Sequence, residues 1–181
     1  GMKRGIIYAD VNNTVSQTYA KEITTPEYGE GLDTLLRKKS EQGQLFGILN
    51  GLDYSLWDPA DDKFIKYPFS AKNLAARIQN KAVLQERFEL PAGEDLFVMG
   101  IVTRMVPQKG IDLLQPIIRA LLNDLPIQLV AVGEGETGIM DFLLNLKKDL
   151  PHKAAVKFEY NQELPHLIYA GADVVLIPSR F

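Results

Sequence analysis

The feature that most constrains the fold is a regular alternation in residues 93–181. Short, almost unbroken apolar runs, which we predict as strands, span 96–102, 127–132, 154–158 and 173–177. The segments between them have the length and spacing of helices, at 110–123, 136–149 and 163–170. Such apolar strands, joined by helices, are typical of parallel sheets covered on both faces. We therefore predict an α/β fold with a Rossmann-like half over 93–181, whose ligand lies at the carboxyl ends of the strands.

The residues before this half predict a smaller α/β piece and a connection. Over 2–50 the pattern predicts strands at 5–9 and 44–49 and helices at 15–23 and 32–40. Over 51–92 it predicts an irregular passage and then one helix, which starts at a Ser70 cap, carries Leu74, Ile78 and Leu84 on one face and ends before Pro91. Trp57 in the irregular passage is either an anchor onto a domain or a binding platform.

Composition narrows the classes of partner. The chain has 181 residues, 46% of them hydrophobic, and a formal net charge of -3, with basic residues scattered along it. We expect neither a nucleic-acid surface nor a membrane span. The absence of cysteine excludes disulfides and thiolate zinc sites and fits a cytoplasmic setting. A glycine before Met2 is typical of a scar left by a protease, so we expect that Gly1 lies outside the natural fold.

The stretch TRMVPQKGIDLL places two cations on the loop after the 96–102 strand. Arg104 and Lys109 precede a helix that we predict to start near Gly110. A helix N-terminus at this edge of a sheet attracts anions, and an arginine with a lysine suits a diphosphate without any metal. The alternative is a solvated loop whose charges pair with nearby acids.

Other candidate positions are less specific. The glycines of AVGEGE, including Gly133, either let the backbone approach a ligand or make a tight turn, and the motif lacks the third glycine of the dinucleotide fingerprint. Tyr160 follows a strand end, where its ring either stacks on a base or closes the core. His152 and His166 have no partners at metal-ligand spacing, and we assign neither a catalytic role.

Five stretches lie in a fixed order along the chain: VSQTYAKEI, GILNGLDYSLWDP, TRMVPQKGIDLL, VGEGE and YNQELPHLIYAGADVVLIPSRF. Their order and gaps resemble those of the bacterial glycogen synthases and plant starch synthases, which are retaining glucosyltransferases of the GT-B architecture. The resemblance implies that residues 2–50 end an N-terminal domain, that 51–92 connect two domains, and that 93–181 are part of the C-terminal, nucleotide-sugar-binding domain.

The resemblance also implies roles for particular residues. Arg104 and Lys109 match the pair that binds the diphosphate of the nucleotide sugar and stabilises it as the leaving group. Tyr160 matches a residue that lies against the adenine, and Asn50 lies in a segment that faces the cleft between the two domains. Further positions expected to bind substrate are Gly133 in VGEGE, and Ser179 and Arg180, which precede a glutamate that contacts the transferred glucose.

The implied activity is transfer of glucose from ADP-glucose to the non-reducing end of an α-1,4-glucan, with no cofactor and no metal, in the cytoplasm or in a plant's plastid stroma. Three positions depart from the family: Thr103 replaces a common glycine, Glu134 a serine and Glu159 a glycine. These departures motivate an alternative, a non-catalytic nucleotide-binding or interaction module.

The family also has a Lys-Thr-Gly-Gly-Leu loop and a Glu-Pro-Cys-Gly-Leu block that this sequence lacks. Such active sites form when two domains close over the donor. We therefore expect the 181-residue chain alone to be inactive, and its sheet to leave an edge prone to self-association.

Overall fold

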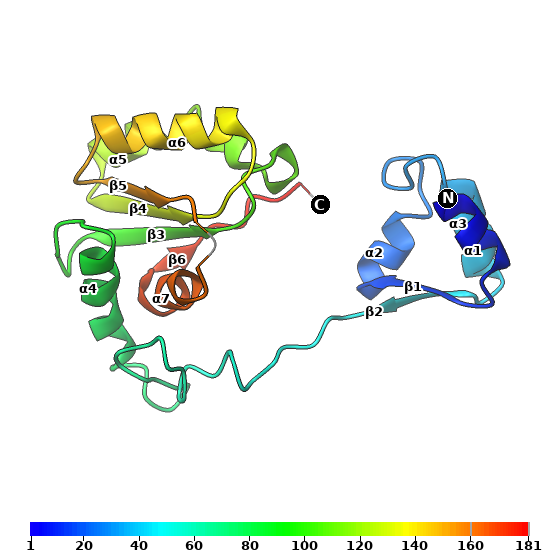
Figure 1. Cartoon of the computed structure of the whole chain (residues 1–181), viewed down its shortest axis with the longest axis horizontal. Coiled ribbons are helices and arrows are strands. Elements are labelled where there is room, and N and C mark those ends of the chain that lie inside the picture. The colour runs from blue at the N-terminus through cyan, green and yellow to red at the C-terminus, as the bar shows by residue number, and fades with distance from the viewer. Residues whose placement is uncertain (160, 181) are drawn as a thin grey trace. The chain divides into compact units, whose positions relative to one another are not determined.

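A computed structural model describes residues 1–159 and 161–180, which divide into two compact units, Gly1–Asp53 and Tyr54–Phe181 (Figure 1). Each unit contains its own parallel sheet and its own helices. The prediction of an α/β fold with parallel strands is therefore confirmed. Within the described residues, no helix has the length and apolar character needed to cross a bilayer.

The first unit is built on two parallel strands, β1 (Asn12–Val15) and β2 (Leu45–Ile48). Its helices are α1 (Met2–Tyr8), α2 (Gln17–Glu22) and α3 (Asp33–Glu41). Ser16 caps α2, because its hydroxyl accepts a hydrogen bond from the N–H of Tyr19 at 3.0 Å. The predicted helices at 15–23 and 32–40 and the strand at 44–49 are thus confirmed.

The predicted strand at 5–9 is wrong, because this apolar run forms part of α1. A run this short does not distinguish a strand from a helix by its periodicity. The strand forms a few residues later, where β2 offers hydrogen-bond partners, beginning with the N–H of Asn12 and the carbonyl of Gln44 at 2.8 Å. The pairing partner, rather than local hydrophobicity, decides where the strand lies.

The second unit contains a four-stranded parallel sheet in the order β5-β4-β3-β6. The strands are β3 (Phe97–Val102), β4 (Ile127–Val132), β5 (Ala154–Lys157) and β6 (Val174–Val175). The chain adds β4 and β5 on one side of β3 and then returns to place β6 on the other side. The strand order therefore reverses beside β3, which is where doubly wound sheets bind their ligands.

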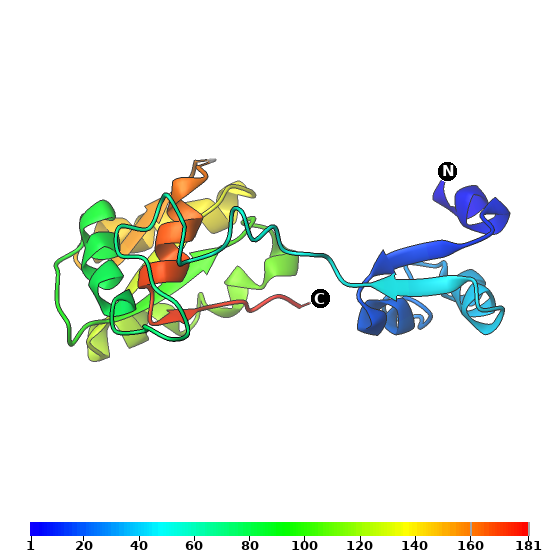
Figure 2. The same cartoon turned by 90° about the horizontal axis from the view of Figure 1, so that it is seen from below.

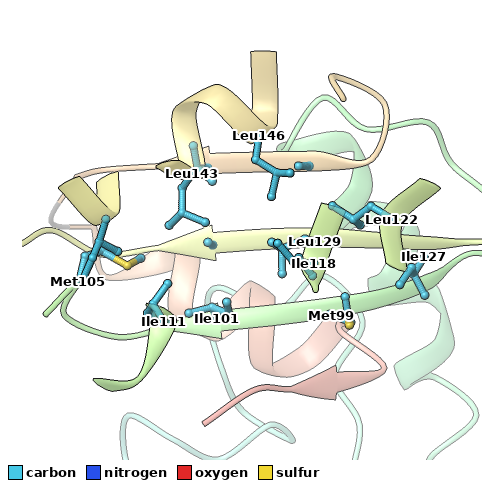
Figure 3. Close-up of a cluster of buried hydrophobic side chains, with 14 residues drawn as sticks. Met99, Ile101, Met105, Ile111, Ile118, Leu122, Ile127, Leu129, Leu143 and Leu146 are labelled. Carbon is cyan, nitrogen blue, oxygen red and sulfur yellow. The ribbon is translucent and has the colours of Figure 1, made fainter. Parts of the chain in front are cut away.

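Helices cover both faces of this sheet (Figure 1), as predicted. They are α4 (Arg77–Arg87), α5 (Ile118–Asp124), α6 (Thr137–Asp149) and α7 (Glu163–Gly171). Side chains of α5 and α6 pack on one face, in a cluster that includes Met105, Ile111, Leu122, Leu129 and Leu143 (Figure 3). Side chains of α4 and α7 pack on the other, in a cluster that includes Leu84, Phe88, Val130, Leu164 and Ile168. Burial of apolar area on both faces is the main term that holds the sheet in place.

One pair of polar side chains, Gln85 and Gln128, is buried beside the cluster formed with α4 and α7. Gln128, the second residue of β4, is 0% exposed, and its side-chain oxygen accepts a hydrogen bond from the amide of Gln85 at 2.9 Å. Its own amide nitrogen donates to the carbonyl of Pro91, also at 2.9 Å. Because every polar atom of Gln128 has a partner, the fold avoids the cost of an unsatisfied buried amide.

The irregular segment 54–69 contacts α7 through Trp57 and the buried side chain of Asp62. The ring of Trp57 stacks on His166 at 3.8 Å between centroids, with an angle of 4° between the planes. His166 also contacts the carboxylate of Asp62 through Nδ1 at 2.5 Å, and both side chains are buried. Figure 2 shows the segment passing beside α7. Trp57 is therefore an anchor, the first of its two interpretations, and the partner of His166 comes from 104 residues away in sequence.

The predicted helix from Ser70 begins later than expected, at Arg77. The hydroxyl of Ser70 accepts a hydrogen bond from the N–H of Lys72 at 3.3 Å, so Ser70 stabilises a local turn rather than a helix. Of the predicted apolar face only Leu84 is buried, whereas Leu74 and Ile78 are 59% and 67% exposed.

Candidate functional site

The candidate site is a hollow of about 620 Å³ at the carboxyl ends of β3, β4 and β5. Three strand-end loops and the start of α7 line it, through Val102, Thr103, Arg104, Val132, Gly133, Glu134, Gly135, Glu159, Asn161 and Pro165. Parallel strands direct their connections to the same edge, so residues far apart in sequence meet here. The sequence predicts the ligand at the carboxyl ends of all four strands; loops after β3, β4 and β5 supply the lining, whereas the segment after β6, near Pro178, supplies none of the described lining residues.

Arg104 lies in this hollow, on an exposed position directly after β3. Lys109 is half-buried on the same loop but is not among the residues that line the hollow. Within the described part of the chain, neither side chain forms an ion pair, in contrast to Arg37, Arg87, Arg119 and Arg180. The alternative that acids of the loop neutralise these two charges therefore finds no support among the described residues.

The helix predicted at 110–123 is present only in its second half, as α5, so its predicted start near Gly110 is wrong. Residues Pro107–Lys109 and Ile111–Leu113 form two 3-10 turns, and α5 begins only at Ile118. Gly110 has a left-handed φ of 69°, and Pro116 disfavours helical geometry at the preceding residue, so both interrupt the helix. No α-helix N-terminus therefore lies directly after the loop with Arg104 and Lys109, and the predicted attraction of an anion by such an N-terminus does not apply. Two other helices begin close to the hollow: α7, at Glu163, whose Pro165 lines it, and α6, at Thr137, which follows the lining residue Gly135.

The glycines of the AVGEGE turn are required by the backbone of the β3 loop. Gly133 has a φ of 138°, and a Cβ there would lie 1.8 Å from the carbonyl oxygen of Thr103. A Cβ on Gly135 would lie 2.2 Å from the carbonyl oxygen of Met105. Met105 in turn exchanges backbone hydrogen bonds with Glu134 and Glu136, at 2.9 and 2.7 Å. Gly133 and Gly135 thus allow the backbone of the loop after β4 to pack against the loop after β3, on both sides of Arg104.

Two carboxylates share the hollow with Arg104. Glu134 and Glu159 line it and are both exposed. Among described residues, no acceptor is found for the backbone N–H groups of Arg104, Glu134 and Gly135. The hollow thus offers a guanidinium and backbone donors, which suit phosphate oxygens, and carboxylates, which suit hydroxyl groups such as those of a ribose.

Arg180 makes contacts that its sequence position did not predict. Its guanidinium donates to both carboxylate oxygens of Asp112, at 2.8 and 2.6 Å, and to the carbonyl of Pro107 at 2.6 Å. The hydrogen bonds from Arg180 hold the pKa of the Asp112 carboxyl below its usual range. No spacing rule links positions 68 residues apart, so sequence reasoning missed this pair.

The remaining predicted positions fall in three places. Asn50 is exposed and belongs to the first unit, whereas the hollow belongs to the second. Ser179 is half-buried on the segment after β6. Tyr160 lies outside the described residues. Among the residues that are described, no cluster of histidine, aspartate and glutamate side chains has the arrangement of a metal site.

Comparison with known proteins identifies relatives along nearly the whole chain. Residues 1–38 match the starch synthase catalytic domain family. The chain is 42% identical over 180 residues to a glycogen synthase from Actinobacillus succinogenes and 46% identical over 180 residues to one from Moorella thermoacetica. In each case the match covers 99% of this chain, and it covers 38% and 36% of the two relatives.

A solved structure shows the same fold. It is the catalytic domain of starch synthase IV from Arabidopsis thaliana bound to ADP and acarbose, which matches with a TM-score of 0.87 and 35% sequence identity. The match covers 99% of this chain and 37% of that one. The chain thus spans little more than a third of the length of these relatives.

Proposed function

We propose, from the premise that the chain belongs to the glycogen and starch synthase family, that it supplies the diphosphate-binding wall of a retaining glucosyltransferase. The donor in this proposal is ADP-glucose, and the acceptor is the 4-hydroxyl at the non-reducing end of an α-1,4-glucan. The relatives' names support the reaction class, and the structural relative that binds ADP and acarbose supports a nucleotide and a glucan as ligands. The family also supports a cytoplasmic site of action.

The observation that carries the proposal is the position of Arg104. Its guanidinium lies in a hollow at the carboxyl edge of a parallel sheet and has no acidic partner among the described residues. A guanidinium can bind two phosphate oxygens at once, and a lysine adds a point charge. Lys109, on the same loop, is the second cation of the proposal.

The chemistry explains why such cations are needed. In the reaction, the bond between the glucose C1 and the diphosphate oxygen breaks, the acceptor oxygen bonds to C1, and the acceptor hydroxyl loses its proton. Negative charge therefore grows on the departing diphosphate. Cations that are already in position stabilise this charge more in the transition state than in the ground state, which accelerates the reaction. In this proposal Arg104 and Lys109 hold the diphosphate and neutralise it as it leaves.

The rest of the hollow completes the proposal for the donor. Glu134 and Glu159 accept hydrogen bonds from ribose hydroxyls, and the N–H groups at Glu134 and Gly135 donate to phosphate oxygens. Asn50 faces the donor glucose and the acceptor, Ser179 lies beside the transferred sugar, and Tyr160 lies against the adenine. Residues 51–92 connect the two domains of the enzyme.

The experiment is a transfer assay combined with calorimetric titration. We expect the full-length product of the reading frame that encodes this chain to move labelled glucose from ADP-glucose onto glycogen. The 181-residue chain by itself should bind ADP weakly, should bind UDP less well, and should transfer no glucose. Glucose transfer by the 181-residue chain would contradict the proposal that a second wall is needed.

A second candidate is a nucleotide-binding module without catalysis. The observation that favours it is the pair of carboxylates at Glu134 and Glu159, which reduces the positive potential of the hollow. This candidate predicts binding of ADP without glucose transfer by the full-length product, and a reading frame without the Lys-Thr-Gly-Gly-Leu and Glu-Pro-Cys-Gly-Leu sequences. The assay therefore separates the two candidates.

A further inference from the structure

The segment after β6 is tied to the loop that carries Lys109, and the ties lie on both sides of that lysine. Before it, the guanidinium of Arg180 donates to the carbonyl of Pro107 at 2.6 Å, and the backbone N–H of Arg180 donates to the carbonyl of Gln108 at 3.0 Å. After it, the same guanidinium donates to both carboxylate oxygens of Asp112. One side chain therefore spans the stretch of backbone in which Lys109 lies.

Backbone contact strengthens this connection. Gly110 adopts a φ of 69°, and a Cβ there would lie 2.0 Å from the carbonyl oxygen of Pro178. The two segments thus touch at the residue directly after Lys109. Next to this contact, Ile111 is fully buried in the core (Figure 3). The loop is therefore held both by packing of Ile111 and by its contacts with the segment after β6.

The position of this contact in the fold is informative. The segment with Arg180 follows β6, and the loop with Lys109 follows β3, its neighbour in the sheet. These are the two strand ends at which the strand order reverses. The loop after β3 also carries Arg104, which lines the hollow at the ends of β3, β4 and β5. Arg180 therefore ties the segment after β6 to a loop of the candidate site, and Lys109 lies on the tied stretch.

The ion pair itself adds little to stability. The side chains of Arg180 and Asp112 are 39% and 41% exposed, and exposed pairs of this kind contribute little because water screens them. A bidentate pair nevertheless fixes geometry, since two parallel hydrogen bonds define the orientation of both planes. The effect of the pair is therefore expected in the position of the loop rather than in the stability of the fold.

We propose that Arg180 is a positioning residue that acts through Asp112 and Pro107 to hold Lys109 against the diphosphate of the donor. This inference rests on the proposed function and adds a residue that acts on the diphosphate only through Lys109. It also assigns to Arg180 a role different from the direct substrate contact that its sequence position suggested. Without the ion pair between Arg180 and Asp112, the loop can move, and the ammonium group of Lys109 then lies too far from the diphosphate to stabilise its charge.

The test is a double-mutant cycle in the full-length product, with kcat, KM for ADP-glucose and thermal midpoint measured for each variant. The variants are Arg180→Ala, Asp112→Ala and the double change, with Arg180→Lys and Asp112→Asn as milder changes that keep the fold. A displacement of a catalytic group by about 1 Å can lower the rate by about a hundredfold, so we expect kcat to fall roughly tenfold to a hundredfold in both single variants. KM should change little, and the double variant should be no slower than Arg180→Ala.

A matched control is available in the same unit. Arg119 and Asp149 form an ion pair of similar exposure, 47% and 50%, between α5 and α6. Arg119→Ala should leave kcat, KM and the thermal midpoint unchanged. A general effect of losing a surface ion pair would instead appear in this variant as well and would overturn the inference.

Other outcomes distinguish a failure of the positioning role of Arg180 from a failure of the diphosphate-binding role of Lys109. If Arg180→Ala is slow and Asp112→Ala is as fast as wild type, or if the two effects multiply, Arg180 acts directly on the substrate and the positioning role is refuted. If both variants keep full kcat, the role is refuted too. Lys109→Ala serves as the reference in the same assay: wild-type turnover in that variant would refute the diphosphate assignment itself, independently of Arg180.

Discussion

Two irregular segments of the second unit carry charged and aromatic side chains, and they use them in opposite ways. In segment 54–69, Asp62 is buried against His166, and Trp57 lies across the same imidazole. In the loop after β3, Arg104 is exposed and has no acidic partner among the described residues. Buried polar groups need partners to offset desolvation, whereas an exposed cation without a partner is available to a ligand. The first segment is thus organised for stability and the second for binding.

The largest expected effect on stability is in the first of these segments. Asp62→Ala leaves the buried imidazole of His166 without its partner, and a buried polar group left without a hydrogen bond costs about 1–3 kcal/mol. We expect this loss in the free energy of unfolding of the second unit, measured by chemical denaturation. Asp61→Ala, at an exposed neighbouring position, is the control and should change stability by less than about 0.5 kcal/mol. Equal stability of the two variants would break the comparison.

The next effect is on turnover in the second segment. Arg104→Ala and Lys109→Ala in the full-length product should each lower kcat by about 10²–10³, the usual consequence of removing one charge-stabilising group from an active site. Thermal midpoints should stay close to that of wild type, because Arg104 and Lys109 form no ion pair with the described residues.

Lys148→Ala, which removes an exposed lysine from α6, is the control and should keep full activity. A variant at 104 or 109 that lost stability while keeping turnover would show that the loop is structural, as segment 54–69 is.

The smallest expected effect concerns pH and the pair that borders the loop. Hydrogen bonds from Arg180 lower the pKa of Asp112 in the folded state. A carboxyl whose pKa is lower when folded contributes stability above its unfolded pKa of about 3.9, and this contribution disappears as pH falls through the folded pKa. Asp112→Asn should therefore differ from wild type by a small, constant amount between about pH 5 and 8, and the difference should vanish in stronger acid. A difference that grew towards low pH would contradict the assignment.

The sequence predicted those parts of the fold that depend on local pattern. Strand β4 has the bounds expected from its apolar run, and α6 and α7 begin and end within a residue or so of their predicted positions. Errors occurred where a distant partner or a backbone conformation decides. The strand predicted at 5–9 lies instead at 12–15, where β2 provides a pairing partner. Gly110 and Pro116 confine the helix predicted at 110–123 to its second half, and 3-10 turns replace its start.

The site divides in the same way. The position of Arg104 followed from its place directly after an apolar strand, because strand ends define the ligand edge. The contacts of Arg180 with Asp112, and of Trp57 with His166, join residues that are far apart in sequence, and only the folded chain brings them together. The pattern thus located the edge, and tertiary contacts determine which side chains remain available there.

Gln128 has a consequence for how the sheet assembles. Side chains alternate between the two faces of a strand, so a shift of β4 by one residue would turn the amide of Gln128 away from Gln85 and Pro91 and into the apolar cluster on the other face. An amide buried there without partners would cost more free energy than burial of a methyl group gains, so the shifted register is less stable than the native one. The one polar side chain of β4 therefore favours a single register for this strand.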